Sequence, residues 1–336
     1  MDALSQVLED IHLKNTEYLY LQTQGEWTFR SPAQSALICH IVMFGELHIH
    51  FDNRQHVHLN TGDMLIIPSG MAHVGKSQSQ ETLLEAVDIE PLFSGLRDDA
   101  IHLGHQRQAQ NKTTPSKSNT HNAEDHATAK SHQRSLIFTI RSKMDSVMAS
   151  PLIHALPTYL HLKNALNAQE PEWLRIGLYF VAEETKRKQA GRHKIMDHLV
   201  SIMLIECIRD YIANLNDPNN WLTALTHPEL SAAFNMIHGH PERAWTVESL
   251  AERCFMSRSK FAQLFNEIVG ETPLAYLQQH RLRLASQMLR NGQLSIQHIA
   301  HQVGYNSETA FSQVFKKHYG LSPSLYRQQS QTQLTE

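Results

Sequence analysis

A block of residues near the end of this chain occurs twice, and that repeat constrains the fold more than any other feature. In the stretch from 294 to 327, "LSIQHIAHQVGYNSETAFSQVFKKHYGLSPSLYR", two Phe, a Gly, a Pro and a Tyr follow one another at intervals of four, five, three and three. Fifty positions earlier the same residue types stand at the same intervals. The two sets are Phe311, Phe315, Gly320, Pro323 and Tyr326, and Phe261, Phe265, Gly270, Pro273 and Tyr276. The chain therefore carries one module twice.

Each copy of the module predicts two short helices joined by a turn. In the first copy, Thr246 is suited to cap one helix and Ser257 to cap the next. In the second copy, Ser295 caps the first helix and Gly304 lies in the turn that follows it. The repeat thus predicts two helix-turn-helix units.

The second helix of each unit has an apolar face and a polar face, because its apolar residues recur at three- and four-residue intervals. We expect the inward side chains to be Phe261, Leu264, Phe265, Ile268, Ala310, Phe311, Val314 and Phe315. Small, amide and basic side chains on the opposite face suit a helix that lies in the DNA major groove. The predicted DNA-contacting residues are Arg258, Ser259, Lys260, Ala262, Gln263, Asn266, Glu308, Thr309, Ser312, Gln313, Lys316 and Lys317. The alternative is an ordinary solvated helix face, which two tandem copies make a poorer interpretation.

The segment between the copies, "PLAYLQQHRLRLASQMLRNG", predicts one helix that ends at Gly292. A helix of that length could hold the two units about one DNA turn, roughly 34 Å, apart. Further basic residues near these helices, Arg281, Arg283 and Arg327, are candidate phosphate contacts.

The stretch "IAHQVGYNSETAFSQVFKKHYGLSPSLYR" resembles the signature of the AraC/XylS family of bacterial transcription regulators, and the resemblance extends over residues 227–328. It implies a domain of two helix-turn-helix units, promoter DNA as a partner, and RNA polymerase as a further partner. The family most often has Arg where Gln263 and Gln313 stand, so the resemblance leaves the operator sequence open.

Charge is distributed unevenly along the chain, whose formal net charge is −3. Residues 1–97 hold 5 basic against 12 acidic residues, and residues 227–336 hold 10 against 8. Because that basic excess is small, the placement of the bases and not the net charge predicts DNA binding. The start of the chain does not resemble a signal peptide and no apolar run could span a membrane, so we expect a cytoplasmic protein. Three widely spaced cysteines predict buried free thiols, with redox switches as the alternative.

The first part of the chain predicts a small antiparallel β-barrel or sandwich. "ALICHIVMFGELHIHFDN" and "QHVHLNTGDMLIIPSGMAHVG" are short β-rich runs interrupted by Gly, Asn and Pro. Residues 98–135 contain no aromatic and almost no aliphatic residue, which predicts a disordered insert. We expect "SLIFTI" to resume the barrel after this insert.

From residue 170 onward the apolar spacing becomes helical and predicts two helices, "EPEWLRIGLYFVAEETKRK" and "GRHKIMDHLVSIMLIECIRDYIANL". The second carries an apolar stripe wider than one neighbouring helix needs. That stripe consists of Ile195, Leu199, Ile202, Met203, Ile205 and Ile208. We expect part of it to contact a second subunit; the alternative is a helix buried entirely within one chain.

Gly62, Pro68, Gly70 and His73 reproduce the spacing of the second cupin motif. Together with the AraC-like module, this makes the chain up to about residue 215 similar to the cupin-type sensor domains of one AraC subgroup. The first cupin motif is missing, because Ile38 stands where its Glu would be. We therefore expect a small effector to bind in the barrel.

The histidines of the barrel allow more than one interpretation. We expect His40 and His73 to line the effector pocket. A metal site for Zn, Ni or Cu could be assembled from His40, Glu46, His48, His50 and His73. Alternatively, these are partly exposed polar residues of strands, and the histidines of the insert belong to a solvated linker. The insert's histidines are His102, His105, His121, His126 and His132.

These patterns predict an α+β chain with an N-terminal cupin-like β-barrel and associated helices, followed by an all-α double helix-turn-helix domain. The expected divisions are 1–97 for the sensor barrel, 98–135 for the His-rich insert, 136–225 for the end of the barrel and the dimerisation helices, 226–328 for the DNA-binding domain, and 329–336 for the tail.

The function predicted from these parts is that of a sequence-specific DNA-binding transcription regulator, not an enzyme, without a cofactor. Its expected partners are promoter DNA, RNA polymerase, a small-molecule effector and a second copy of the chain, with no membrane contact. The alternative is a cupin metalloenzyme with a helical appendage. The incomplete first cupin motif and the complete repeat favour the regulator.

Overall fold

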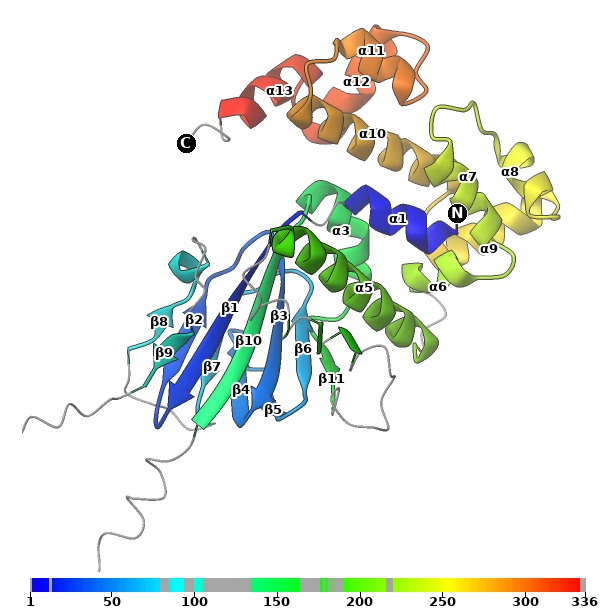
Figure 1. Ribbon diagram of the computed structural model, residues 1–336. Helices are drawn as coiled ribbons and strands as arrows, with labels where there is room; N and C mark the ends of the chain where they lie inside the picture. Colours follow the sequence, from blue (N-terminus) through cyan, green and yellow to red (C-terminus); the bar gives the residue numbers. More distant parts are fainter. Residues whose placement is uncertain are drawn as a thin grey trace, which may run out of the picture. The chain divides into compact units, whose positions relative to one another are not determined.

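A computed structural model shows two compact units that interleave along the sequence (Figure 1). The strand unit comprises Leu13–Met144 and Leu156–Cys207, and the helix unit comprises Met1–His12, Asp145–Ala155 and Ile208–Glu336. The structure describes residues 2–11, 14–78, 85–93, 100–104, 134–163, 176–177, 179–180, 183, 190–215 and 220–332. The divisions predicted from the sequence follow chain order, whereas two early segments belong to the same unit as the C-terminal helices.

In its described residues, the strand unit contains a six-stranded sheet, ordered β11-β6-β3-β10-β1-β9, and a five-stranded sheet, ordered β5-β4-β7-β2-β8. The strands are β1 (Lys14–Gln24), β2 (Thr28–Ser31), β3 (Ala36–Phe44), β4 (Glu46–Phe51), β5 (His56–Asn60), β6 (Met64–Ile67), β7 (His73–Lys76), β8 (Val87–Asp88), β9 (Ile101–Leu103), β10 (Arg134–Lys143) and β11 (Leu160–Leu162), with a 3₁₀ turn at Glu90–Leu92. β9 pairs in parallel with β1, and β8 pairs in parallel with β2; the other described pairs are antiparallel.

The core of the strand unit lies between its two sheets. In β4, Leu47, Ile49 and Phe51 are buried and alternate with polar residues that face outward, which is the pattern of a strand with one wet face. Residues from both sheets, among them Phe29 and Ile38, join the same apolar cluster. This arrangement agrees with the predicted barrel or sandwich.

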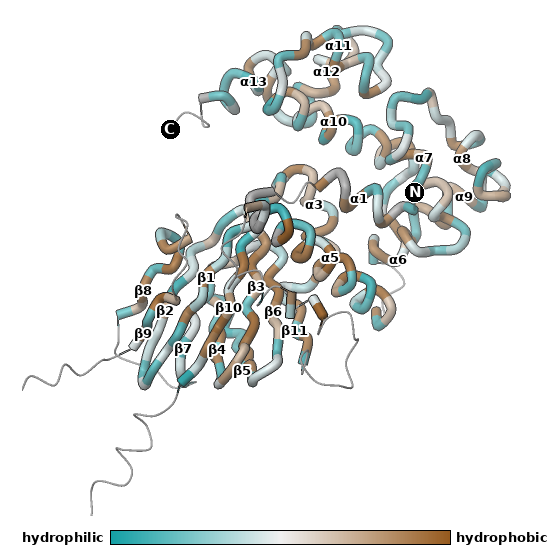
Figure 2. Tube along the Cα trace, viewed as in Figure 1, coloured by the Kyte–Doolittle hydropathy of each residue, from teal (hydrophilic) through white to brown (hydrophobic). Residues whose placement is uncertain are grey.

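The six-stranded sheet is covered on both faces around β3. Seven successive residues of β3 are buried, and Figure 2 shows this strand as mostly hydrophobic. Helix α5 (Arg192–Ala213) lies over the outer face, where Asp197 accepts a hydrogen bond from the backbone N–H of Thr16 in β1. Burial, and then the neighbouring Cys207 of α5, raises the pKa of Cys39 in β3 well above its usual value. No local pattern in the sequence indicates that these two cysteines are neighbours.

The helix unit contains the repeated module and, in front of it, further helices. Its described helices are α1 (Ala3–Ile11), α3 (Ser146–Ala155), α6 (Trp221–Thr226), α7 (Ser231–Gly239), α8 (Val247–Arg253), α9 (Arg258–Val269), α10 (Pro273–Asn291), α11 (Ile296–Gln302), α12 (Glu308–Tyr319) and α13 (Pro323–Thr332). α8 with α9 and α11 with α12 form the two helix-turn-helix units, and α10 is the helix predicted between them. Thr246, Ser257 and Ser295 cap their helices as predicted.

An ion pair joins α3 to α10 inside the helix unit. Asp145 accepts hydrogen bonds from the backbone N–H groups of Val147 and Met148, at 3.0 and 3.1 Å, and thereby caps α3. Its other oxygen accepts from the guanidinium of Arg290 on α10, which also donates to the hydroxyl of Tyr326 at 2.8 Å. Asp145 raises the pKa of Arg290, against the effect of burial.

The predicted α+β class and the double helix-turn-helix are confirmed, and several local expectations need correction or fall outside the described residues. Ile101–Leu103 forms strand β9, although it was assigned to the disordered insert, because it pairs with the edge strand β1. Residues 105–133 of the insert lie outside the described residues, as does most of the helix expected over 170–188. Helices α1 and α3 were not expected. No described helix has the length and apolar character that crossing a membrane requires.

Candidate nucleic-acid interface

Helices α9 and α12, which we call the recognition helices, begin and end in the same way. The hydroxyl of Ser257 accepts from the N–H of Lys260, and the hydroxyl of Ser307 accepts from the N–H of Ala310. Each helix is 12 residues long and ends at a glycine in the left-handed conformation, with φ of +82° at Gly270 and +75° at Gly320. The sequence repeat is therefore a structural repeat.

Aromatic packing fixes the rotation of both recognition helices about their axes. Phe261 and Phe265 are fully buried, with ring centroids 5.7 Å apart, and Phe265 also contacts Tyr276 of α10 at 5.9 Å. In the second unit the rings of Phe311 and Phe315 are buried and 5.5 Å apart. Phe315 contacts Tyr326 at 5.3 Å, in the position that Tyr276 takes in the first unit.

The residues predicted to contact DNA lie on the face opposite these rings. All twelve are exposed except Ala262 and Ser312, which are half-buried. Of the residues predicted to face inward, Leu264 and Val314 are half-buried. Ala310 is exposed, which corrects the prediction. It lies in the first turn of α12, where only the four-residue spacing to Val314 places it near the inner face.

Acidic residues bind three polar side chains of the first recognition helix, those of Arg258, Lys260 and Gln263. Arg258 pairs with Glu248 of α8 at 2.7 Å, and Lys260 pairs with Glu229 at 2.6 Å. The side-chain amide of Gln263 donates to Glu267, one turn further along the helix, at 2.8 Å. The two basic residues of α9, Arg258 and Lys260, lie near its N-terminal end, and each forms an ion pair with an acidic residue.

The second recognition helix has the opposite order of charge. Its acid, Glu308, is in the first turn, and Lys316 and Lys317 are in the last, which suits the helix dipole. Neither lysine forms an ion pair with any residue that the structure describes. Lys317 stands one turn after Gln313, in the position that Glu267 has in the first copy. Gln313 is therefore followed one turn later by a basic residue, whereas Gln263 is followed one turn later by an acidic residue.

Two of the arginines considered as phosphate contacts are structural. Arg281 donates to the carbonyl oxygens of Pro241 and Arg243, both at 2.7 Å. Arg327 donates to the carbonyl of Leu294 at 2.6 Å. These carbonyl acceptors lie in loops far away in sequence, so the sequence alone could not identify them.

In the strand unit, His40 and His73 meet across the core. They lie on β3 and β7, one in each sheet, and their Nε2 atoms are 2.8 Å apart. His73 Nδ1 must donate to the carbonyl of Met71, at 2.8 Å, so its Nε2 accepts from His40 Nε2–H. His40 Nδ1 then accepts from the hydroxyl of Thr139, at 2.9 Å.

Both imidazoles of this pair are neutral. Burial, and then His73, holds the pKa of His40 well below its usual value. Burial also lowers the pKa of His73 to about 4, although the bond to Met71 opposes the shift. The two predicted effector residues are therefore neighbours, and both lie fully buried in the core. The other barrel histidines considered for a metal, His48 and His50, lie with Glu46 on the outer face of β4.

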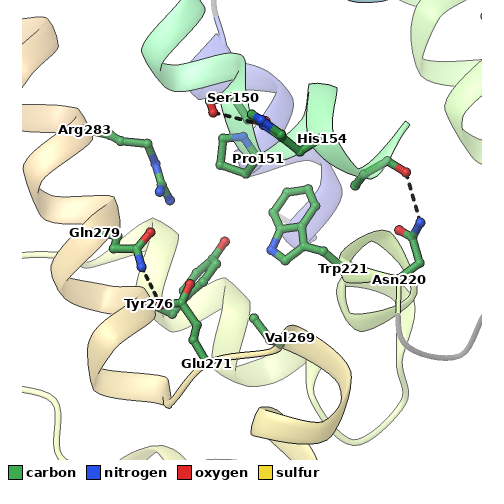
Figure 3. Close-up of a pocket in the computed structure, with 11 residues that line it drawn as sticks. Ser150, Pro151, His154, Asn220, Trp221, Val269, Glu271, Tyr276, Gln279 and Arg283 are labelled. Atoms are coloured by element: carbon green, nitrogen blue, oxygen red, sulfur yellow. Dashed lines mark hydrogen bonds between the residues drawn. The ribbon is translucent and has the colours of Figure 1, made fainter. Parts of the chain in front are cut away.

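A cavity of about 440 Å³ opens in the helix unit between α3, α6 and α10 (Figure 3). Arg283, Gln279 and Tyr276 reach from α10 toward Pro151 and Trp221. The indole Nε1 of Trp221 is buried and has no hydrogen-bond partner among the described residues. Sequence analysis did not identify this cavity, because its walls come from segments far apart in the chain.

Comparison with known proteins agrees with both halves of this description. A cupin family model matches residues 2–213, and a helix-turn-helix domain model matches residues 250–329. The HTH-type transcriptional regulator AlkR of Acinetobacter baylyi is 54% identical over 330 residues, which cover 98% of this chain and 100% of the relative. The RCS-specific HTH-type transcriptional activator RclR of Escherichia coli is 37% identical over 174 residues, 52% of this chain and 61% of the relative. The solved DNA-binding domain of AdpA, in complex with a target DNA, is 28% identical, covers 32% of this chain and 95% of that chain, and has a TM-score of 0.30.

The neutral histidine pair predicts that the strand unit loses stability in mild acid. Unfolded His73 titrates near its usual pKa of 6.5 and folded His73 at about 4, so the unfolded state binds more protons in this window. The free energy of unfolding should therefore fall as pH falls from 6.5 to 4, by about 3 kcal/mol for His73 alone. Thermal unfolding followed across this range checks it. His73→Gln should be less stable at pH 7.5 but show a shallower pH dependence, and equal slopes for both proteins would contradict the assignment.

Proposed function

Because this chain belongs to the AraC-type transcription regulators that carry an N-terminal cupin domain, we propose that α9 and α12 read promoter DNA under the control of a small effector. The chain is a DNA-binding transcription regulator; its relatives are named as regulators, and the alternative of a cupin metalloenzyme finds no support among them. The observation that carries the proposal is the pair of recognition helices, each with buried phenylalanines on one face and polar side chains on the other.

Two sets of side chains enter the major groove in this proposal. They are Ser259, Ala262 and Gln263 in the first unit and Thr309, Ser312 and Gln313 in the second. An amide can donate and accept at once, so both glutamines have the groups needed to read adenine. Arg258, Lys260, Asn266, Glu308, Lys316 and Lys317 flank these sets.

The second unit supplies most of the electrostatic attraction in this proposal. Lys316 and Lys317 can approach phosphate without breaking an ion pair in the described chain. Lys260 must first leave Glu229, and Arg258 must leave Glu248. A base that exchanges one partner for another gains less than a solvated base does. Bound at a promoter in this way, the protein would have RNA polymerase as its further partner.

We further propose a homodimer formed through α5. The wide apolar stripe of α5 has a buried part and an exposed part. Met203 and Ile208 are buried, whereas Ile195 is 42% exposed and Ile202 is 53% exposed. A Cβ atom added at Gly177 would lie 3.8 Å from the side chain of Met203, which puts the exposed Tyr179 and Phe180 on a segment beside α5. Exposed apolar side chains gathered on one helix and its neighbour are typical of a subunit contact. A two-fold contact would match this patch to its own copy.

The effector can be received in either of two places. The first is the core around His40 and His73, where the polar pair lies among aromatic rings, with Phe29 5.6 Å from His40 and Phe51 6.0 Å from His73. A ligand there would replace the bond between the two imidazoles.

The second place is the cavity between α3, α6 and α10. It is already open, and both the indole N–H of Trp221 and the guanidinium of Arg283 are donors on its wall. A small molecule with an acceptor group could satisfy the buried indole N–H, which is costly to leave without a partner. A ligand there would contact α10, the helix that holds both recognition helices.

The DNA contacts are tested by binding titrations at several salt concentrations. Gln313→Ala should weaken operator binding by about 1 to 3 kcal/mol and leave random DNA unaffected. Lys317→Ala should weaken both and lower the salt slope by about one unit, with a smaller change for Lys260→Ala because Glu229 already neutralises that base. If Gln313→Ala weakened operator and random DNA equally, a different face would lie in the groove.

The dimer is tested by sedimentation of the full chain. Ile202→Glu places a charge in the exposed stripe and should yield monomers, because a buried unpaired carboxylate is costly at an interface. Leu325→Glu, a like change at an exposed residue of α13, should leave the oligomeric state unchanged. A monomeric unmodified protein, or a dimer unaffected by Ile202→Glu, would exclude this contact.

The effector site is tested with a reporter gene under the target promoter, in inducing and non-inducing cultures. Trp221→Phe removes the indole N–H and part of the ring from the cavity wall while keeping an aromatic side chain, and His73→Ala removes one partner of the buried pair. Loss of induction with retained operator binding in one variant identifies the site. Full induction in both would place effector reception outside these two sites.

A further inference from the structure

The outer face of the hairpin formed by β4 and β5 gathers histidines into rows. The register pairs His48 with His58 and His50 with His56 directly across the two strands. Buried Leu47, Ile49, Val57 and Leu59 alternate with them and point to the core. The imidazoles therefore share the solvent-facing side of the sheet, and Glu46, two residues before His48, shares it too.

Three of these side chains bring their ligand atoms together. The Oε2 atom of Glu46 is 2.9 Å from His58 Nε2 and 4.0 Å from His48 Nε2. The rings of His48 and His58 are stacked, with centroids 4.2 Å apart and an angle of 1° between planes. The candidate ligand atoms of all three residues lie within 4.8 Å of one another.

These separations are close to those that a bound metal needs. Zn²⁺ with imidazole and carboxylate ligands has bonds of about 2.0 to 2.2 Å, so neighbouring ligand atoms in a tetrahedron are about 3.3 Å apart. The two measured distances lie on either side of that value. Small rotations of the exposed His58 and the half-buried Glu46 and His48 side chains would suffice, without a change in the backbone.

The charges around the hairpin favour this end of it. Lys76 of β7 pairs with His48 in the register, so one base also stands beside the hairpin. The carboxylate of Glu46 lies within 4.0 Å of imidazole nitrogens of both His48 and His58, and it supplies the negative charge that attracts a cation at this end.

Among the described residues, the interior of the barrel does not offer a comparable site. His73 occupies the position of the cupin motif's metal-binding histidine, but its free nitrogen lone pair accepts the N–H of His40. We propose that Glu46, His48 and His58 bind a divalent transition metal of the Zn²⁺ class on the outer face of the hairpin, with a fourth position left to water. Two imidazoles and one carboxylate, with an open position, are a ligand set that Zn²⁺ accepts. Occupancy would hold β4 and β5 together through their side chains.

The test uses the full chain, stripped of metal with a chelator, and titrated with Co²⁺ while visible absorption is recorded. One Co²⁺ should bind with the bands of a low-coordinate nitrogen and oxygen site, and added Zn²⁺ should displace it. Losing a group that only orients a ligand costs about 10 to 100-fold in affinity, so His58→Ala should weaken binding by about a hundredfold or more. His56→Ala, on the same face of the same strand, should bind as the unmodified protein does.

Glu46→Gln serves as a second variant, because it keeps the size of the side chain and removes the charge. It should also weaken Co²⁺ binding strongly, and it decides the outcome if His58→Ala does not fold. Equal affinity in the unmodified protein and Glu46→Gln, or equal losses in His58→Ala and His56→Ala, would overturn the proposal. So would the absence of a tight equimolar Co²⁺ site in the unmodified protein.

Discussion

The burial of two phenylalanines in each recognition helix is the constraint on which the DNA-facing surface depends. Phe261 with Phe265, and Phe311 with Phe315, are four residues apart and fully buried, so each pair determines which side of its helix faces the core. Every other residue of the helix then has a fixed direction. Replacing one buried Phe by Ala costs about 3 to 5 kcal/mol, which is a large part of a typical domain's stability. The side chains proposed to contact DNA are thus oriented by the buried side chains on the opposite face of each helix.

The sequence predicted the parts of this structure that depend on local patterns. The helix caps at Thr246, Ser257 and Ser295 and the phenylalanine spacing are properties of short segments, and all were recognisable without a structure. The partners of Lys260 and Arg281 were not, because Glu229 and the carbonyl of Pro241 come from segments about 30 to 40 residues away. The sequence alone could therefore identify the charged residues of the proposed DNA-facing side, but it could not show which of them already form ion pairs or hydrogen bonds within the protein.

The histidines of the strand unit show the same division. Alternation along β4 correctly placed Glu46, His48 and His50 on one face. His58 was missed because it belongs to the next strand, and only the register brings it opposite His48. A signal was present, since both "LHIHF" and "HVHLN" have histidines two residues apart on either side of a four-residue turn. Aligning those two segments as a hairpin would have predicted the rows. The contact of His40 with His73 across two sheets had no such local signal.

The chain runs directly from strand β10 of the strand unit to helix α3 of the helix unit, so the two units are joined covalently at this point. Strand β10 carries Thr139, which donates to His40 in the barrel core, and ends at Lys143. Two residues later, Asp145 caps α3 and binds Arg290 of α10, which in turn binds Tyr326 in the second repeat. Within the helix unit, Asp145 therefore links the cap of α3 to the helix between the two helix-turn-helix units. Because one carboxylate both caps α3 and binds Arg290, a displacement of Asp145 changes the cap of α3 and its bond to α10 together.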